Sequence, residues 1–229
     1  MALNPSNAVP DQTIPGNDGF YEMILNGASQ SDDDHTLQHT LGIVAAILAA
    51  RTSLSVGALA DILGFNVEDL RRSLNRVESL IYIPDDNFDP SIRVLHTSFG
   101  GYLLKRAPSR FRIPSVLGDD VLALGCLNLM AKQLHFNISQ SQSSYEPNAC
   151  TKPSTVTLSL EYACLHWIYH LSSIPKASPI EDDINNIFCA RFLFWLEVMS
   201  ILGQLGRATA MLLFAAEMVH QQCLSRCIQ

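Results

Sequence analysis

The sequence predicts a mainly α-helical protein, with a winged-helix-like domain that carries a small β-hairpin followed by an antiparallel helical array. Three observations predict this class. Apolar residues recur at helical spacing in three consecutive segments, two short β-rich runs follow them, and only helical patterns occur after residue 119. With 229 residues and 48% hydrophobic residues, the chain is long enough to bury a sizeable core.

Changes in composition divide the chain into four predicted parts. Residues 1–17 contain three prolines among Asn, Asp and Gly residues, so we expect a flexible leader. Residues 18–106 form the winged-helix-like domain together with a short preceding helix. Residues 107–118 contain two prolines and form a connector, and residues 119–229 form the helical domain.

Capping signals place the three helices of the winged-helix-like domain. The first helix runs from about His35 to Ala50, after a run of aspartates that suits the positive end of a helix. Ser55 then caps a second helix, Val56–Leu63, and Gly64 suits the left-handed residue at its end. Asn66 caps the third helix.

Two β-rich runs, Leu80–Ile83 and Ile92–Leu95, predict the strands of a hairpin, because turn residues join them over Pro84–Ser91. A final helix, Ser98–Lys105, is expected to pack behind the hairpin. Three helices followed by a hairpin are the order of elements in a winged helix.

Helical patterns continue to the end of the sequence. We expect helices over Val121–Leu134 and Leu158–Ser172, separated by a polar loop over Asn137–Ser154. A further helix begins at a capping signal around Ser178 and extends to about Leu202. The last helix runs from Arg207 to about Leu224.

Seven blocks of sequence follow one another between residues 18 and 216, and one of them reads RVLHTSFGGYLL. They are Asp18–Leu25, Leu41–Val56, Arg71–Pro84, Arg93–Leu104, Leu122–Ile138, Leu160–Leu171 and Phe192–Leu213. In this order they resemble the region that follows the NACHT ATPase domain in large fungal NLR-like (STAND) proteins. Gly100-Gly101 stands where that family usually has a polar pair, which weakens the start of the helix.

The resemblance implies a non-enzymatic regulatory and interaction module, which in full-length relatives couples an NTPase to sensor repeats. Its expected partners are proteins or the NTPase domain. None of the twelve glycines is followed by lysine, so this sequence has no G-x-x-x-x-G-K-[ST] phosphate loop. We therefore expect no cofactor. We expect the chain to be a truncated paralogue, a gene-model fragment or a stand-alone partner.

His96 ends the second β-rich run. The resemblance implies that this histidine contacts the β-phosphate of ADP in the wider class of ATPase switches. An imidazole N–H can donate a hydrogen bond to phosphate, but the contact is weak without a cradle of backbone amides. In this chain we expect a vestigial nucleotide-sensing residue that lies at the hairpin–helix junction and forms half of an interdomain contact.

Three arginines, Arg71, Arg72 and Arg76, lie on the helix that contacts DNA in other winged helices. Glu68 and Asp69 precede them at the end of the helix where groove contacts usually occur. We expect an interdomain face here, and the net charge of −7 makes nucleic acid an unfavoured partner. The alternative is a winged-helix nucleic-acid-binding regulator with a helical dimerisation domain.

Two weaker patterns concern metals. Residues 85–89 copy the first three ligands of a calcium loop, but Pro90 occupies the position that requires glycine. Cys164, His166 and His170 share a helix at a spacing that can bind zinc, although amphipathic histidines beside a core tryptophan are the usual explanation of such a pattern. We predict no metal site, and the absence of a G-x-S-x-G elbow or another catalytic constellation predicts no enzyme.

Compartment and surface follow from composition. The six cysteines are scattered among apolar helical residues and no secretory signal begins the sequence, so we expect reduced thiols in a cytoplasmic protein. The apolar segment Leu41–Ala50 has about half the length needed to span a membrane. Charged residues make up only 16% of the chain, which suggests apolar surface intended for partners.

Overall fold

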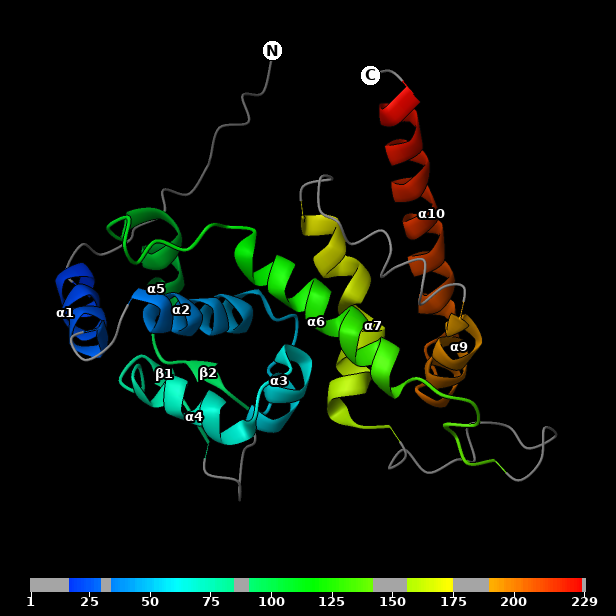
Figure 1. Ribbon diagram of the computed structural model, residues 1–229, viewed down its shortest axis with the longest axis horizontal. Helices are drawn as coiled ribbons and strands as arrows, with labels where there is room; N and C mark the ends of the chain where they lie inside the picture. Colours follow the sequence, from blue (N-terminus) through cyan, green and yellow to red (C-terminus); the bar gives the residue numbers. More distant parts are fainter. Residues whose placement is uncertain (1–16, 30–33, 85–90, 142–155, 175–189, 228–229) are drawn as a thin grey trace, which may run out of the picture.

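The computed structural model describes residues 17–29, 34–84, 91–141, 156–174 and 190–227, the last ten of these without their side chains. Helices dominate these residues, and a small antiparallel hairpin is the β-structure that accompanies them (Figure 1). The predicted mainly α-helical class with a small hairpin is confirmed. The leader expected over residues 1–17 lies almost entirely outside the described residues.

Four helices precede the hairpin, and their ends follow local capping chemistry. They are α1 (Asp18–Ser29), α2 (Asp34–Ala49), α3 (Val56–Leu63) and α4 (Val67–Asn75). The Ser55 hydroxyl accepts the Ala58 N–H at 3.1 Å, as predicted for the start of α3. Gly64 ends α3 with φ 71°, and the side chain of Asn66 accepts the Glu68 N–H at 2.9 Å.

The hairpin consists of β1 (Ile81–Tyr82) and β2 (Arg93–Val94), which are shorter than the predicted runs. Ile81 pairs with Val94 and Tyr82 with Arg93 in antiparallel register. The segment before α3 joins the same structure, because Ser55 bridges Ser91 and the Ile92 N–H donates to the Leu54 carbonyl at 2.8 Å. Residues 85–90, which contain the calcium-like pattern, lie outside the described residues.

The helix expected over Ser98–Lys105 is divided in two. It begins as α5 (Thr97–Gly101) and continues as a π-helical turn, η2 (Tyr102–Arg106). The Ala107 N–H donates to the Tyr102 carbonyl at 2.8 Å, which is the five-residue span of a π-helix. A helix lies where it was predicted, but its second half is π-helical instead of α-helical.

The remaining helices are α6 (Leu117–Gln133), α7 (Leu158–Ser173), α9 (Phe192–Ile201) and α10 (Leu205–Cys227). Figure 1 shows α6 and α7 crossing with opposite chain directions. The helix α6 begins four residues before the predicted Val121, inside the expected connector. The capping signal at Ser178 lies outside the described residues.

The helix α6 joins the two parts, because it packs on α2 and α3 on one side and on α7 on the other. Two glycines allow this close packing. A β-carbon at Gly118 would lie 2.2 Å from the Ala45 carbonyl oxygen, and one at Gly125 would lie 2.5 Å from that of Ile62. One hydrophobic core consequently extends from α1 to the beginning of α10.

Among the described residues, no helix combines the length and apolar character that crossing a membrane requires.

Candidate functional site

His96 lies where β2 ends and α5 begins, as the sequence predicts. It occupies the N-cap position of α5 with φ −127° and ψ 116°, but its side chain makes no capping hydrogen bond. The side chain is exposed, and its ring centroid lies 6.4 Å from that of Tyr21 on α1. The imidazole is therefore accessible to a partner and does not serve to cap the helix.

Aromatic side chains of α1, α5 and η2 pack together next to His96. Tyr21 is fully buried, its ring lies 5.3 Å from the rings of Phe99 and of Tyr102, and its hydroxyl hydrogen-bonds to Ser98 at 2.7 Å. Within the described residues, the buried hydroxyl of Tyr102 has no hydrogen-bond partner. Burial raises the pKa of Tyr102, and nearby Glu22 adds to that increase.

An ion pair connects helix α1 to the π-helical turn η2. The Arg106 guanidinium on η2 contacts both carboxylate oxygens of Asp18 on α1, at 2.8 and 3.0 Å. Both side chains are about two-thirds buried, with exposed fractions of 27% and 32%. The arrangement is bidentate, so it fixes the orientation of α1 as well as its distance from η2.

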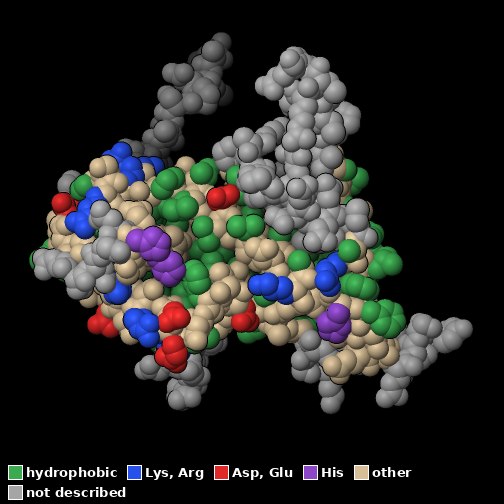
Figure 2. All heavy atoms as spheres, viewed as in Figure 1, with side chains coloured by type: hydrophobic (Ala, Val, Ile, Leu, Met, Phe, Trp, Pro, Cys, Tyr) green, Lys and Arg blue, Asp and Glu red, His purple; other side chains and the backbone are tan. Residues whose placement is uncertain are grey.

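The three predicted arginines lie on or next to α4, but they have different surroundings. Arg71 donates to the Pro84 carbonyl at 3.4 Å, and Arg76 is the half-buried C-cap residue of α4. Arg72 is exposed and pairs with Asp69 at 2.8 Å. Acidic and basic side chains lie next to one another over this part of the surface (Figure 2). The face is mixed in charge, which suits a protein partner better than phosphate.

A groove of about 550 Å³ separates α4 from the hairpin. Arg71 and Glu78 line it from one side, and Tyr82 and Leu95 line it from the other. Leu95 is half exposed and directly precedes His96 along the chain. The groove therefore connects the predicted arginine face to the residue next to the predicted histidine.

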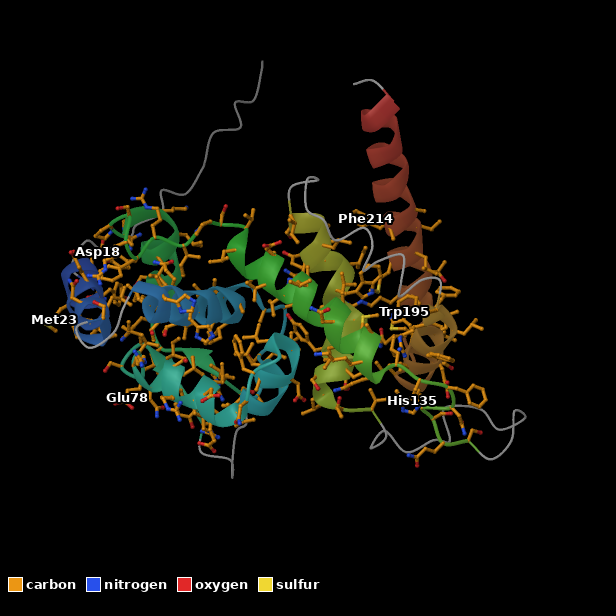
Figure 3. All side chains as sticks on the ribbon, viewed as in Figure 1. Asp18, Met23, Glu78, His135, Trp195 and Phe214 are labelled. Carbon is orange, nitrogen blue, oxygen red and sulfur yellow. The ribbon has the colours of Figure 1, made fainter. Side chains whose placement is uncertain are left out.

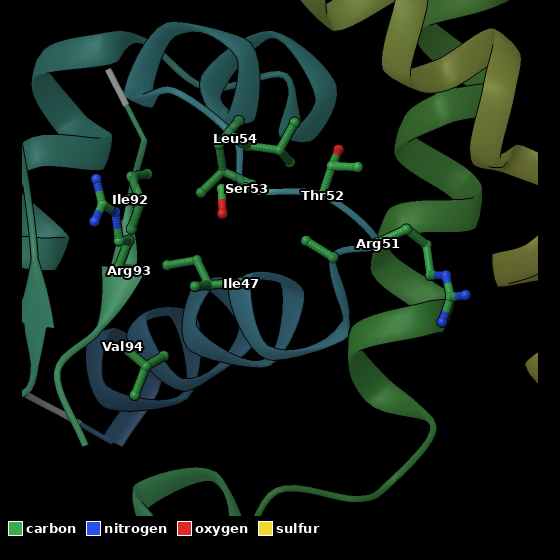
Figure 4. Close-up of a pocket in the computed structure, with 10 residues that line it drawn as sticks. Ile47, Arg51, Thr52, Ser53, Leu54, Ile92, Arg93 and Val94 are labelled. Atoms are coloured by element: carbon green, nitrogen blue, oxygen red, sulfur yellow. The ribbon is translucent and has the colours of Figure 1, made fainter. Parts of the chain in front are cut away.

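A second, smaller pocket of about 340 Å³ lies between the end of α2, the turn after it and β2. Ile47, Leu54 and Val94 supply apolar walls, and the side chain of Arg51 leads away from the pocket (Figure 4). Its volume lies at the lower end of the range for ligand pockets, and polar as well as apolar side chains line it. The sequence pattern did not indicate this pocket, since its walls come from three separate elements.

The histidines of the zinc-like pattern lie inside the molecule. His170 hydrogen-bonds to Asp119 and Tyr162, and His166 accepts a long hydrogen bond of 3.4 Å from Arg207. In the part of the chain that the structure describes, no three metal-ligating side chains converge. The sequence pattern did not indicate Asp119 as a partner of His170, because that contact depends on how α6 packs against α7.

Exposed apolar side chains occur at both ends of the molecule. Phe20 and Met23 on α1 are 44% and 63% exposed, and Leu213 and Phe214 on α10 are 66% and 43% exposed. Figure 3 shows Met23 and Phe214 on opposite sides of the structure. This distribution agrees with the apolar surface that the low charge content predicts.

Comparison with known proteins gives one informative similarity. No family model matches the sequence, and no solved structure matches the fold. A curated protein, vegetative incompatibility protein HET-E-1 from Podospora anserina, is 23% identical over 220 residues. The chain is distantly similar to HET-E-1. The alignment covers 85% of this chain and 16% of HET-E-1.

The extent of the match limits which properties of HET-E-1 can be inferred for this chain. It includes most of the chain, so it supports a distant relationship that is not confined to one short segment. It spans less than a fifth of HET-E-1, and the activity and partners of the whole HET-E-1 protein are therefore proposals for this chain.

Proposed function

We propose that the chain is a non-enzymatic regulatory module of a fungal NLR-like signalling protein, equivalent to the winged-helix and helical part that follows a NACHT NTPase. It acts in the cytoplasm by coupling the nucleotide state of that NTPase to the sensor end of the protein. The exposed His96, at the hairpin–helix junction beside the docked helix α1, is the observation that carries this proposal.

The order and packing of elements support the winged-helix assignment. Helices α2, α3 and α4 precede the hairpin, and the segment before α3 adds a bridge to the strand that ends the hairpin. The similarity to HET-E-1, a vegetative incompatibility protein, supports a signalling role in a fungus.

The mechanism is differential packing of this surface on the NTPase. In the ADP state, His96 donates a hydrogen bond to the nucleotide, and the half-exposed Leu95 packs on the NTPase beside it. The exposed residues Phe20 and Met23 of α1 extend the contact. A ligand shifts such an equilibrium only through contacts that differ between the two states, and His96 supplies one of them.

Calorimetry with a fungal NACHT NTPase domain tests the proposal. The chain is titrated into the domain loaded with ADP or with a non-hydrolysable ATP analogue. We expect tighter binding to the ADP form, and His96→Ala weakens that binding about tenfold, because a hydrogen bond to a charged group is lost.

The matched control is His135→Ala, since His135 is also exposed and lies far from this corner (Figure 3). It should leave both affinities unchanged. Equal affinity for the two nucleotide states, or an equal effect of both variants, would reject the proposed coupling.

A further inference from the structure

A chain of hydrogen bonds links α7 to two other elements inside the molecule. The Arg51 N–H, in the turn after α2, donates to the Tyr162 hydroxyl at 3.1 Å. That hydroxyl lies 2.8 Å from Nε2 of His170, and Nδ1 of His170 lies 2.7 Å from a carboxylate oxygen of Asp119 on α6. His170 is fully buried.

The partners fix the direction of every proton in this chain. A carboxylate accepts only, so Nδ1 of His170 carries the proton that Asp119 receives. Nε2 is then an acceptor, and the Tyr162 hydroxyl donates to it. The Tyr162 oxygen remains free to accept the Arg51 N–H. With a neutral imidazole, each donor therefore has one acceptor.

A second proton on His170 breaks this order. Nε2–H then points at the Tyr162 oxygen, which already accepts the Arg51 N–H. The hydroxyl proton of Tyr162 loses its acceptor in a site with little solvent. That proton must then rotate to the side of the oxygen that receives the Arg51 N–H, where two donors face each other, so the bond from Arg51 is the one that breaks.

The charged and titratable groups around His170 shift its pKa in opposite directions. Burial lowers the pKa of His170, Asp119 raises it through its hydrogen bond and charge, and Arg51 lowers it. The other groups of this kind nearby are Tyr162, Tyr169 and His166 on α7, Arg207 on α10 beside His166, and Cys126 on α6 near Tyr162.

Arg51 is held to α7 at two points. Besides its N–H bond to Tyr162, its guanidinium lies 3.8 Å from the ring centroid of Tyr169. The same residue begins the turn that forms one wall of the 340 Å³ pocket next to the hairpin (Figure 4). The position of this wall consequently depends on the two contacts that α7 makes with Arg51.

We propose that the Arg51–Tyr162–His170–Asp119 chain is a proton-sensitive latch, which holds the turn after α2 against α7 and opens when His170 is protonated. Opening frees the turn and changes the shape of the adjacent pocket. The inference is a property of this chain alone and stands independently of the proposed NTPase coupling.

Nuclear magnetic resonance of the whole chain tests the latch without any substitution. At pH 8, nitrogen-15 spectra should show His170 with its proton on Nδ1. As the pH is lowered from 8, His170 should take up a proton only below the ordinary pKa of a histidine, and the protection of the Arg51 amide against hydrogen exchange should fall about tenfold in step with it. The Leu59 amide in α3, which donates to Ser55, is the internal control and should keep its protection.

Two variants give the direction of the effect. Asp119→Asn removes the negative charge that favours the imidazolium, so the opening should move to lower pH. Tyr162→Phe removes the acceptor of the Arg51 N–H, so protection of that amide should be low at every pH. If His170 stays neutral until the whole chain unfolds, or if it titrates while Arg51 remains protected, the latch does not exist.

Discussion

Gly118 shows at the level of one residue why this molecule packs as it does. A β-carbon at this position would lie 2.2 Å from the Ala45 carbonyl oxygen and 2.7 Å from the β-carbon of Ala49. No other residue therefore fits without movement of the backbone. Gly125 repeats the situation against Ile62, seven residues further along α6. The sequence placed Gly118 in the connector and the start of the helix at Val121, and glycine is by preference a poor helix former. Packing overrides that preference here.

Replacing Gly118 by alanine should therefore destabilise the protein. We expect the free energy of unfolding to fall by about 1–3 kcal/mol, because α6 must move away from α2. Urea denaturation followed by circular dichroism measures the change.

The control is Gly57→Ala in α3, where a β-carbon would meet nothing within 4 Å. This change should raise stability by up to about 1 kcal/mol, because alanine favours the helix. Equal urea midpoints for the two variants would show that Gly118 is not a packing requirement.

Single elements differ in how well the sequence predicts them. The ends of α3 and the start of α4 follow from Ser55, Gly64 and Asn66, since caps are chemistry between neighbours in the chain. The π-helical turn after α5 was missed because nothing in its own sequence requires it. The hydrogen-bond chain of His170 was missed for a similar reason, since its members lie on separate elements and their proximity depends on the packing of α6 and α7.

Helix α1 is held by a buried aromatic side chain more than by charge. Tyr21→Ala should lower the free energy of unfolding by about 3–5 kcal/mol, because it empties a fully buried aromatic site. Asp18→Asn should cost about 1 kcal/mol or less, since its partly exposed ion pair with Arg106 is screened by solvent.

The neighbouring Phe20→Ala provides the comparison for α1. Phe20 is 44% exposed, so its removal should change stability by about 0.5 kcal/mol. Thermal denaturation of the three variants gives the ranking. A loss for Phe20→Ala as large as that for Tyr21→Ala would show that α1 docks through a different face.

At the scale of the whole molecule, one core among the described residues unites α1 and the elements around the hairpin with helices α6, α7, α9 and α10. Trp167 and Trp195 meet edge to face at 6.4 Å in the helical array, and His166 is buried on the same helix as Trp167. Because burial and the nearby Arg207 lower the pKa of His166 to about 4, the folded protein keeps this imidazole neutral in mild acid.

The stability of the whole fold should consequently fall in acid. The unfolded chain binds a proton at His166 near its ordinary pKa of about 6.5, while the folded chain binds it only near 4. The free energy of unfolding therefore keeps its full value above about pH 6.5. It falls by about 2–3 kcal/mol as the pH drops toward about 4. Urea midpoints measured from pH 7.5 to pH 4.5 test this, and His166→Gln should flatten the curve whereas His135→Gln should not.

The π-helical turn at Tyr102–Arg106 has a consequence for insertions and deletions. It holds one more residue per turn than an α-helix, so removing a single residue there would restore regular geometry without breaking the helix. Five π-helical residues turn the chain through nearly the same angle as four α-helical ones, so Arg106 would keep its direction toward Asp18. A homologue that is one residue shorter at this place is therefore expected to anchor its first helix through the same ion pair.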